Sequence, residues 1–417
     1  MQTYLMPACI SNFHCIAGAC DDNCCHGWSV YIDKNTYQKY QDNKSKDLGD
    51  ELRKKTVRID DETTDRQYAK YVMNVNGDCP FFNEQGLCRI QLVLGKEMLP
   101  RTCINYPHVV NSIDGVLEIS AQLSCPVIAK AVMLSPKPML FIDAKIDRQL
   151  LPNKAFNPSE HTDKPERFFQ ELRAFGIATL QNRNYSIPER LVLLGVFYNQ
   201  LSKNEDSYNI LNLIEIAKQQ HANVNDTKQQ LSPIQAVPSM QIQLLKLISD
   251  HKTKASSKKY QAMYQDALQG LGFNEGLDEG NEKGTDEGAG KEIDERQVLE
   301  NYLSGIELYV KPFFYEHGYI LEHVLVHEFF LMMMPFGSFQ TIWESYMYLM
   351  LLYGLIKFFM TGIACKKGYL DVQTVQSIIQ STAREILHNE QLIKQIILIF
   401  QKNNLHTQAH MTILALH

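Results

Sequence analysis

The sequence lacks a long uncharged apolar run. Its most apolar stretch, residues 345–356, is bounded by Glu344 and Lys357 and leaves only 12 residues without charge, whereas a membrane-spanning helix needs about 20. The first residues contain neither the basic segment nor the apolar segment of a secretory signal. We therefore expect a cytoplasmic protein without stable membrane association, in which residues 345–356 form a buried helix.

The sequence also lacks an excess of basic charge. Its 417 residues include 41 Lys and Arg against 47 Asp and Glu, which gives a net charge of −6. A nucleic-acid partner or an anionic membrane surface is therefore not expected. The shares of hydrophobic residues (45%) and charged residues (21%) are ordinary for soluble globular proteins, and the length predicts two domains.

Motifs of nucleotide binding and radical chemistry are absent. No glycine-rich turn of the Rossmann type follows a predicted strand. The Cys-x3-Cys-x2-Cys triplet of radical enzymes is also missing. Cys20 and Cys24 have the spacing of its first two cysteines, but Gly27 stands where the third would be. The glycines of residues 270–294 stand among acidic side chains that would repel phosphate, so this segment is predicted to be a flexible acidic linker.

Cysteine, by contrast, is abundant near the N-terminus. Nine of the ten cysteines lie within the first 125 residues. Thiols crowded in this way form disulfides, bind zinc or hold an iron–sulfur cluster, and disulfides are rare in the cytosol. Eight of the nine form two groups and are all candidate metal ligands: Cys15, Cys20, Cys24 and Cys25, then Cys79, Cys88, Cys103 and Cys125.

The spacing of these cysteines favours an iron–sulfur cluster over zinc. Intervals of 3, 4, 8, 14 and 21 residues match no common zinc finger, and the adjacent Cys24 and Cys25 can rarely both ligate one small ion. A cluster has four separate corners, so ligands from several loops are tolerated. Eight candidates exceed the four ligands that one cluster needs.

The sequence predicts a mainly α fold. A loop-rich, cysteine-cluster N-terminal domain with short β-strands is expected over residues 1–150, followed by a larger all-helical domain. The helical domain is expected in two parts, residues 151–269 and 295–417, on either side of the acidic linker 270–294. Ser186 and Glu189 have the spacing of a capping box that begins a helix.

Local signals divide the cysteine-rich domain into short elements. Residues 28–33 alternate as a strand does, and Asp33 is placed to cap a short helix. Residues 109–120 read as a hairpin that turns at an Asp-Gly pair. Pro126 suits the first turn of a helix, and the positive end of that helix would favour a thiolate at Cys125.

Around the cysteines the sequence resembles a known family. The motifs are Phe13-x-Cys15, Cys20-Asp-Asp-Asn-Cys24-Cys25-His-Gly-Trp28, Cys79-Pro-Phe-Phe82, Gly86-Leu-Cys88-Arg-Ile90 and Leu99-Pro-Arg-Thr-Cys103-Ile-Asn-Tyr-Pro107. They are similar to those of the flagellin lysine-N-methylase (FliB) family, whose cysteine-rich part is shared with a broader group of small metal-binding proteins. Cys9 lies outside this pattern. A weaker likeness continues through Leu123-Ser-Cys125-Pro126, residues 186–191 and residues 383–389.

The resemblance implies a methyltransferase that uses S-adenosylmethionine, carries a [4Fe-4S] cluster and modifies lysine side chains of flagellin, the flagellar filament subunit. The lysine nitrogen would attack the sulfonium methyl directly, with the cluster as a scaffold. Alternatively, an iron without a thiolate ligand would hold the donor or receive its methyl group. Arg101 is expected to bind the cofactor, by donating to cluster sulfurs or to the donor's carboxylate. His26 is a candidate for hydrogen bonding a cluster sulfur.

Two other functions are open on the residues alone. The same cysteines would serve a non-enzymatic iron–sulfur protein for electron transfer or metal storage, or a zinc-binding interaction protein. His323 and His327 place two imidazoles on one helix face but do not form the H-E-x-x-H zinc motif, so a core or surface pair is favoured. Arg384 and His388, four residues apart, could bind a carboxylate, but a solvated helix face is favoured.

Overall fold

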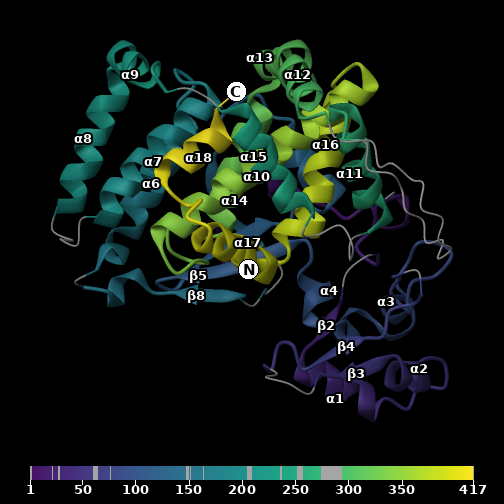
Figure 1. Cartoon of the computed structure of the whole chain (residues 1–417). Coiled ribbons are helices and arrows are strands. Elements are labelled where there is room, and N and C mark those ends of the chain that lie inside the picture. The colour runs from purple at the N-terminus through teal and green to yellow at the C-terminus, as the bar shows by residue number, and fades with distance from the viewer. Residues whose placement is uncertain are drawn as a thin grey trace, which may run out of the picture. The chain divides into compact units, whose positions relative to one another are not determined.

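A computed structural model groups the chain into two compact units, which are considered one at a time (Figure 1). Unit 1 comprises Met1–Ser112, Val116–Ala131 and Phe141–Lys154, and unit 2 comprises Ile113–Gly115, Val132–Leu140 and Ala155–His417. The predicted acidic linker 270–294 falls mostly outside the described residues. The residues that the structure describes are 2–20, 22–26, 29–59, 64–75, 77–146, 150, 152–162, 164–203, 209–234, 237–250, 257–273 and 294–416.

Unit 1 combines two small sheets with short helices. The larger sheet has the strand order β7-β1-β6-β5-β8, and the smaller has the order β2-β4-β3. The strands are β1 (Gln2–Pro7), β2 (Tyr31–Ile32), β3 (Thr56–Arg58), β4 (Ala69–Tyr71), β5 (His108–Ile113), β6 (Val116–Ala121), β7 (Phe141–Ile146) and β8 (Lys154–Phe156). The α-helices are α1 (Lys34–Asp42), α2 (Gly49–Lys54), α3 (Arg89–Leu94), α4 (Arg101–Asn105) and α5 (Pro126–Met133).

The larger sheet is mixed. β1 runs antiparallel to β7, with Gln2 opposite Ile146, and parallel to β6, with Leu5 opposite Glu118. The predicted hairpin is confirmed as β5 and β6, which are joined by Asp114 and Gly115. Both turn residues have positive φ, 47° and 81°, as a two-residue hairpin turn of the favoured hand requires.

The smaller sheet carries the start of helix α1. The Asp33 carboxylate accepts a hydrogen bond from the Thr36 backbone N–H at 3.0 Å, which confirms the predicted N-cap. The strand is shorter than predicted, because β2 comprises only Tyr31–Ile32. A buried core with Tyr40, Tyr71 and Phe81 lies beneath these elements.

Within the residues described, the regular secondary structure of unit 2 is helical apart from the ends of β5 and β8. Its first α-helices are α6 (Phe169–Leu180), α7 (Ile187–Lys203), α8 (Ile210–Ala222), α9 (Val224–Leu231), α10 (Pro238–Asp250) and α11 (Lys258–Leu271). The later ones are α12 (Glu295–Gly305), α13 (Lys311–His317), α14 (Tyr319–Leu331), α15 (Ile342–Lys367), α16 (Val372–Thr382), α17 (Glu390–Lys402) and α18 (Gln408–Ala415). Two five-residue π-helices interrupt this series, η8 (Ile306–Val310) and η9 (Ala383–Leu387). The structure confirms the mainly α fold.

Helix α15 is the central helix of unit 2. It contacts α7, α10, α11, α12 and α18 (Figure 1). Its 26 residues are long and apolar enough to cross a membrane by length and composition, but 94% of its most apolar window is buried inside the protein. The prediction of a buried helix is confirmed. The helix is longer than the uncharged apolar stretch and continues beyond Lys357 to Lys367.

A close helix crossing fixes α15 against α11. A Cβ on Gly362 would lie only 2.4 Å from the backbone oxygen of Ala267, so the two backbones approach at a distance that only glycine permits.

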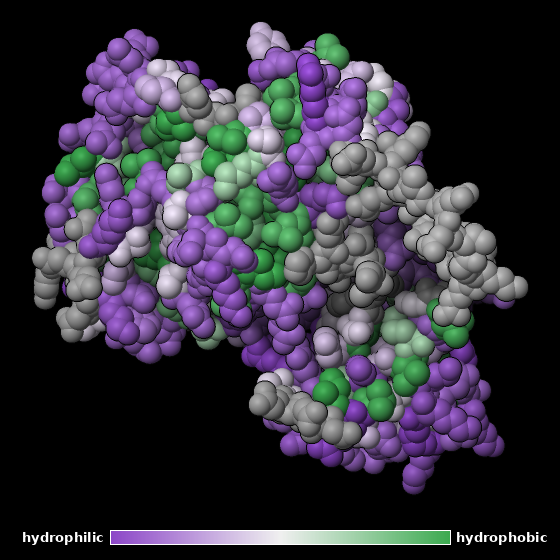
Figure 2. All heavy atoms as spheres, viewed as in Figure 1, coloured by the Kyte–Doolittle hydropathy of each residue, from purple (hydrophilic) through white to green (hydrophobic). Residues whose placement is uncertain are grey.

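The outer surface is mostly polar. Figure 2 shows hydrophilic residues over most of the visible face and apolar residues in smaller groups.

Candidate functional site

The candidate metal ligands lie in loops and at the starts of short helices of unit 1. Cys88 immediately precedes α3, Cys103 lies inside α4 and Cys125 immediately precedes α5. The loop with Cys15 and Cys20 packs closely on the loop before Cys88, because a Cβ on Gly18 would lie 2.9 Å from the carbonyl oxygen of Gln85. Segments that are distant in sequence therefore lie side by side.

Five thiols form one neighbourhood, which we call the inner cysteine group: Cys24, Cys25, Cys79, Cys88 and Cys103. The Cys25 side chain hydrogen bonds with those of Cys24 and Cys79, and the Cys79 N–H donates to the Cys25 carbonyl at 2.8 Å. Burial raises the pKa of Cys103 well above its usual range, and the nearby sulfurs of Cys79, Cys24 and Cys88 raise it further. The hydrogen bond from Cys25 lowers the pKa of Cys79.

The remaining candidates form an outer cysteine group of Cys15, Cys20 and Cys125. Burial raises the pKa of Cys125 to about 11, and Cys20 and Cys15 add to this effect. The backbone N–H groups of Ile128 and Val127 lower that pKa, as expected at a helix start, but burial outweighs them. The start of α5 thus favours a thiolate at Cys125, as predicted, but burial opposes the thiolate more strongly.

None of the ten cysteines, all of which lie in the described ranges, forms a disulfide. No disulfide therefore competes with a metal for the sulfurs. Within the described ranges, however, no three His, Cys, Asp or Glu side chains are arranged to hold a metal ion. The five thiols of the inner cysteine group lie near one another, whereas coordination of a cluster by these sulfurs stays a prediction.

The two polar side chains predicted beside the cluster have partners within unit 1. The His26 Nδ1 pairs with the Asp78 carboxylate, an arrangement that directs Nε2 away from the carboxylate, as in many metal-binding histidines. The Arg101 guanidinium donates to the Pro152 carbonyl at 2.8 Å, and burial lowers its pKa. The structure thus gives Arg101 one anchoring contact in unit 1, and its role toward a cofactor stays a prediction.

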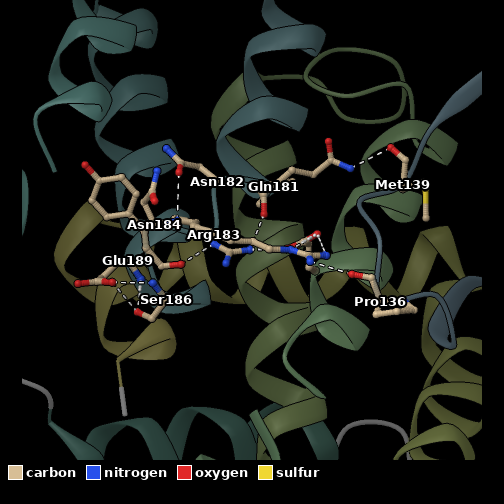
Figure 3. Close-up of polar contacts among 12 residues, drawn as sticks. Pro136, Met139, Gln181, Asn182, Arg183, Asn184, Ser186 and Glu189 are labelled. Carbon is tan, nitrogen blue, oxygen red and sulfur yellow. Dashed lines mark hydrogen bonds and ion pairs between the residues drawn. The ribbon is translucent and has the colours of Figure 1, made fainter. Parts of the chain in front are cut away.

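Unit 2 contains a buried ion triad. Glu322 on α14 is 1% exposed and accepts hydrogen bonds from Arg183 at 2.8 Å and from Arg190 at 2.8 Å. Figure 3 shows Arg183 also reaching the carbonyl of Pro136, a contact of 2.8 Å. The predicted capping box lies beside this triad and is confirmed, because the Ser186 N–H donates to Glu189 at 2.6 Å and the Glu189 N–H donates to the Ser186 hydroxyl at 3.5 Å.

A second buried polar group lies further along α14. We call Glu328, His327, Tyr348 and His388 the α14 polar cluster. The Tyr348 hydroxyl donates to Glu328 Oε2 at 2.7 Å, and His327 Nδ1 lies 3.7 Å from Glu328 Oε1. Burial lowers the pKa of His388 to about 4, although the neighbouring Glu328 carboxylate raises it.

The histidine predictions have mixed outcomes. His323 is 2% exposed and His327 is 0% exposed, so the two imidazoles belong to the core, as favoured. The interpretation of His388 as part of a solvated face is wrong, because its ring is buried enough to disfavour the imidazolium. Tyr348 was not a candidate from the sequence, since a tyrosine in an apolar helix is ordinarily packing.

Comparison with known proteins gives a match in unit 2. The family model for the FliB lysine N-methylase C-terminal domain matches residues 173–414. A lysine-N-methylase of Salmonella typhimurium is 25% identical over 192 residues, 46% of each chain. The chain thus spans about half the length of this curated relative. The flagellar biosynthetic protein FliU of Salmonella muenchen is 28% identical over 143 residues, 34% of this chain and 84% of that protein. No solved structure matches the chain.

The family match has a clear position in the fold. It contains the ion triad and the α14 polar cluster, whereas every candidate metal ligand lies before its first residue. The family match therefore lies entirely within unit 2.

Proposed function

Because the chain belongs to the FliB lysine N-methylase family, we propose that it transfers methyl groups from S-adenosylmethionine to lysine side chains of flagellin. The observation that carries this proposal is the family match over more than half of the chain. The names of the relatives support it, since one is a lysine-N-methylase and another a flagellar biosynthetic protein.

The second part of the proposal is a [4Fe-4S] cluster in unit 1. The inner cysteine group supplies more than the four thiols that a cluster needs, and none of them forms a disulfide. Backbone N–H groups also reach these sulfurs: the N–H of Phe81 contacts Cys79, and those of Ile90 and Gln91 contact Cys88. Hydrogen bonds of this kind are typical of cluster ligands. A bound cluster would tie the loops together and, at an iron without a thiolate, would offer a place for the donor's amino and carboxylate groups.

Methyl transfer requires the protein to deprotonate the substrate lysine. The lysine nitrogen must be neutral to attack the sulfonium methyl, yet the pKa of a lysine in water is about 10.4. A desolvated site lowers that pKa, and a nearby group must take the proton. The C–N bond then forms as the C–S bond breaks, and the sulfur leaves as a neutral thioether.

The proposal is tested by incubating anaerobically purified protein with flagellin and S-adenosylmethionine. We expect mass spectrometry to find methyl increments on flagellin lysines. Absence of methylation in protein that carries its metal would overturn the activity. Methyl groups on another protein, with flagellin unmodified, would keep the methyltransferase and overturn the substrate.

The cluster is tested separately by replacing cysteines with serine. We expect Cys79→Ser and Cys103→Ser to lose iron, whereas Cys9→Ser and Cys365→Ser, outside both cysteine groups, retain it. Colourless protein rich in zinc would contradict the cluster. Iron loss only on replacing Cys15 or Cys20 would move the cluster to the outer cysteine group.

A further inference from the structure

Two carboxylates are buried on the same helix, and they have different partners. Glu322 is bound by Arg183 and Arg190. Glu328 is 2% exposed and receives a hydrogen bond from Tyr348, and its ion-pair partner among the residues described is the imidazole of His327 rather than an arginine or lysine. Arg384 acts on the neighbouring imidazole of His388. A buried carboxylate without a directly paired cation is costly, so Glu328 differs from Glu322 in the contact that a cation would provide.

The imidazole of His388 does not supply such a cation. His388 is held neutral by its lowered pKa of about 4. His327 is fully buried, and neither ring nitrogen has a hydrogen-bond partner among the described residues. Buried polar atoms are nearly always hydrogen bonded in native proteins, to protein, water or ligand. The site thus offers one carboxylate and an unsatisfied imidazole to an incoming donor.

A primary ammonium group matches these features. It carries one positive charge and three N–H donors. One donor satisfies the Glu328 carboxylate and another satisfies an acceptor nitrogen of His327, while Tyr348 holds the carboxylate in place. A neutral alcohol of the same length would leave the carboxylate without a counter-charge.

We propose that Glu328, His327 and Tyr348 form a binding site for a primary alkylammonium group. This inference rests on the proposed function, which brings two such groups to the protein: the side chain of the substrate lysine and the amino group of the methyl donor. The π-helix η9, which ends directly before His388, also supports a ligand site, because π-helical turns occur frequently at functional sites.

For a lysine, the same carboxylate can take the proton that must be lost. An N–H bond breaks and an O–H bond forms on Glu328, which leaves a neutral amine and a neutral carboxylic acid. A desolvated site favours this pair over two separate charges. The amine lone pair is then available for attack on the sulfonium methyl.

The test measures binding without flagellin, so that it does not depend on turnover. Full-length, metal-loaded protein is titrated with n-butylammonium, with 1-butanol and with S-adenosylmethionine, by calorimetry or ligand-observed NMR. We expect n-butylammonium to bind wild type at least about tenfold more tightly than 1-butanol, and Glu328→Gln to lose about tenfold or more of the n-butylammonium affinity. Tyr348→Phe should weaken it less, because the charge remains.

Tyr346→Phe is the matched control. Tyr346 is also buried on α15, but its hydroxyl donates to the Leu191 carbonyl at 3.1 Å, so this variant should bind n-butylammonium like wild type. Equal binding of n-butylammonium and 1-butanol by wild type would overturn the site even if Glu328→Gln failed to fold. So would unchanged affinity in folded Glu328→Gln and Tyr348→Phe.

The titrations also identify the source of the ammonium. A loss confined to n-butylammonium assigns the site to the substrate lysine, and a loss confined to S-adenosylmethionine assigns it to the donor's amino group. Ammonium binding at Glu328 in protein that methylates nothing would keep the site and overturn the proposed function. Methylation of flagellin by Glu328→Gln at the wild-type rate would keep the function and overturn the proton transfer.

Discussion

At the scale of single residues, Glu322 shows how this protein stabilises a buried charge. Its carboxylate accepts from both Arg183 and Arg190, and Arg190 also donates to the carbonyls of Leu180 and Tyr185. Arg190 is nearly as buried as the carboxylate, whereas 41% of the Arg183 side chain is exposed. The two arginines should therefore differ in their contribution to stability.

We predict that Arg190→Met lowers the free energy of unfolding by about 3 kcal/mol. The substitution leaves Glu322 buried with one arginine that is partly in water. Arg183→Met is the control and should cost less, because water screens that side chain. Urea unfolding followed by circular dichroism measures both. Equal losses of unfolding free energy in the two variants would show that the burial of each arginine does not determine its contribution to stability.

Lys357 gives stability a pH dependence. This side chain is 0% exposed inside α15 and donates to the carbonyls of Ala415 and Leu416 at 3.3 Å each, near the end of α18. Burial lowers its pKa from 10.5 to about 7. Because the unfolded chain binds the extra proton between those two values, the contribution of Lys357 to stability grows as pH rises from about 7 to about 10.

We therefore predict that the unfolding free energy of wild type rises relative to that of Lys357→Met as the pH increases over that range. Parallel urea titrations at pH 7 and pH 9.5 measure the difference. Lys367→Met, at the half-exposed end of the same helix, should show no such change. A pH-independent difference for Lys357→Met would mean that the folded protein keeps this amine charged.

At the scale of elements, local chemistry was predictable where its cause lies within a few residues. Asp33 and Thr36 form a cap, Ser186 and Glu189 form a capping box, and an Asp-Gly pair makes the hairpin turn. In each case the sequence contains both partners. The π-helices η8 and η9 and the passage of α15 through Lys357 were not predictable, because packing from distant helices determines them.

The crossing of α11 and α15 leads to a prediction at the same scale. Gly362→Ala should destabilise unit 2 by about 1–3 kcal/mol, because the new Cβ would meet the Ala267 backbone and force the helices apart. Gly354→Ala is the control. Its Cβ would lie 2.9 Å from the Leu245 side chain, which can change rotamer. Thermal unfolding should show the larger loss for Gly362→Ala, and the reverse order would exclude the crossing as the cause.

At the scale of the whole molecule, the cysteine groups and the family match lie in different units. The cysteine groups lie in unit 1, and the residues matched by the family model lie in unit 2. The proximity of the cysteines was predictable because thiols cluster along the chain, whereas their binding of a metal stays a prediction. The sequence did not predict that Arg190 pairs with Glu322, 132 residues away, or that Tyr348 meets Glu328, because neither pairing leaves a periodic signal.

Metal removal should affect the two units unequally. If the cysteines hold a cluster, stripping the iron removes cross-links from unit 1. We predict that calorimetry of the stripped protein shows an early transition at a lower temperature, while the transition that carries most of the helical signal stays in place. A scan unchanged by complete iron removal would contradict a cluster held by the cysteines of unit 1.

The position of β1 has a consequence during synthesis. Residues 2–7 are translated before both of their partner strands, yet their strand lies inside the larger sheet, between β6 and β7. One partner ends at residue 121 and the other at residue 146, so the nascent strand has both edges unpaired while most of unit 1 is translated. A chaperone that binds unpaired nascent strands should therefore raise the yield of this protein by acting during that interval.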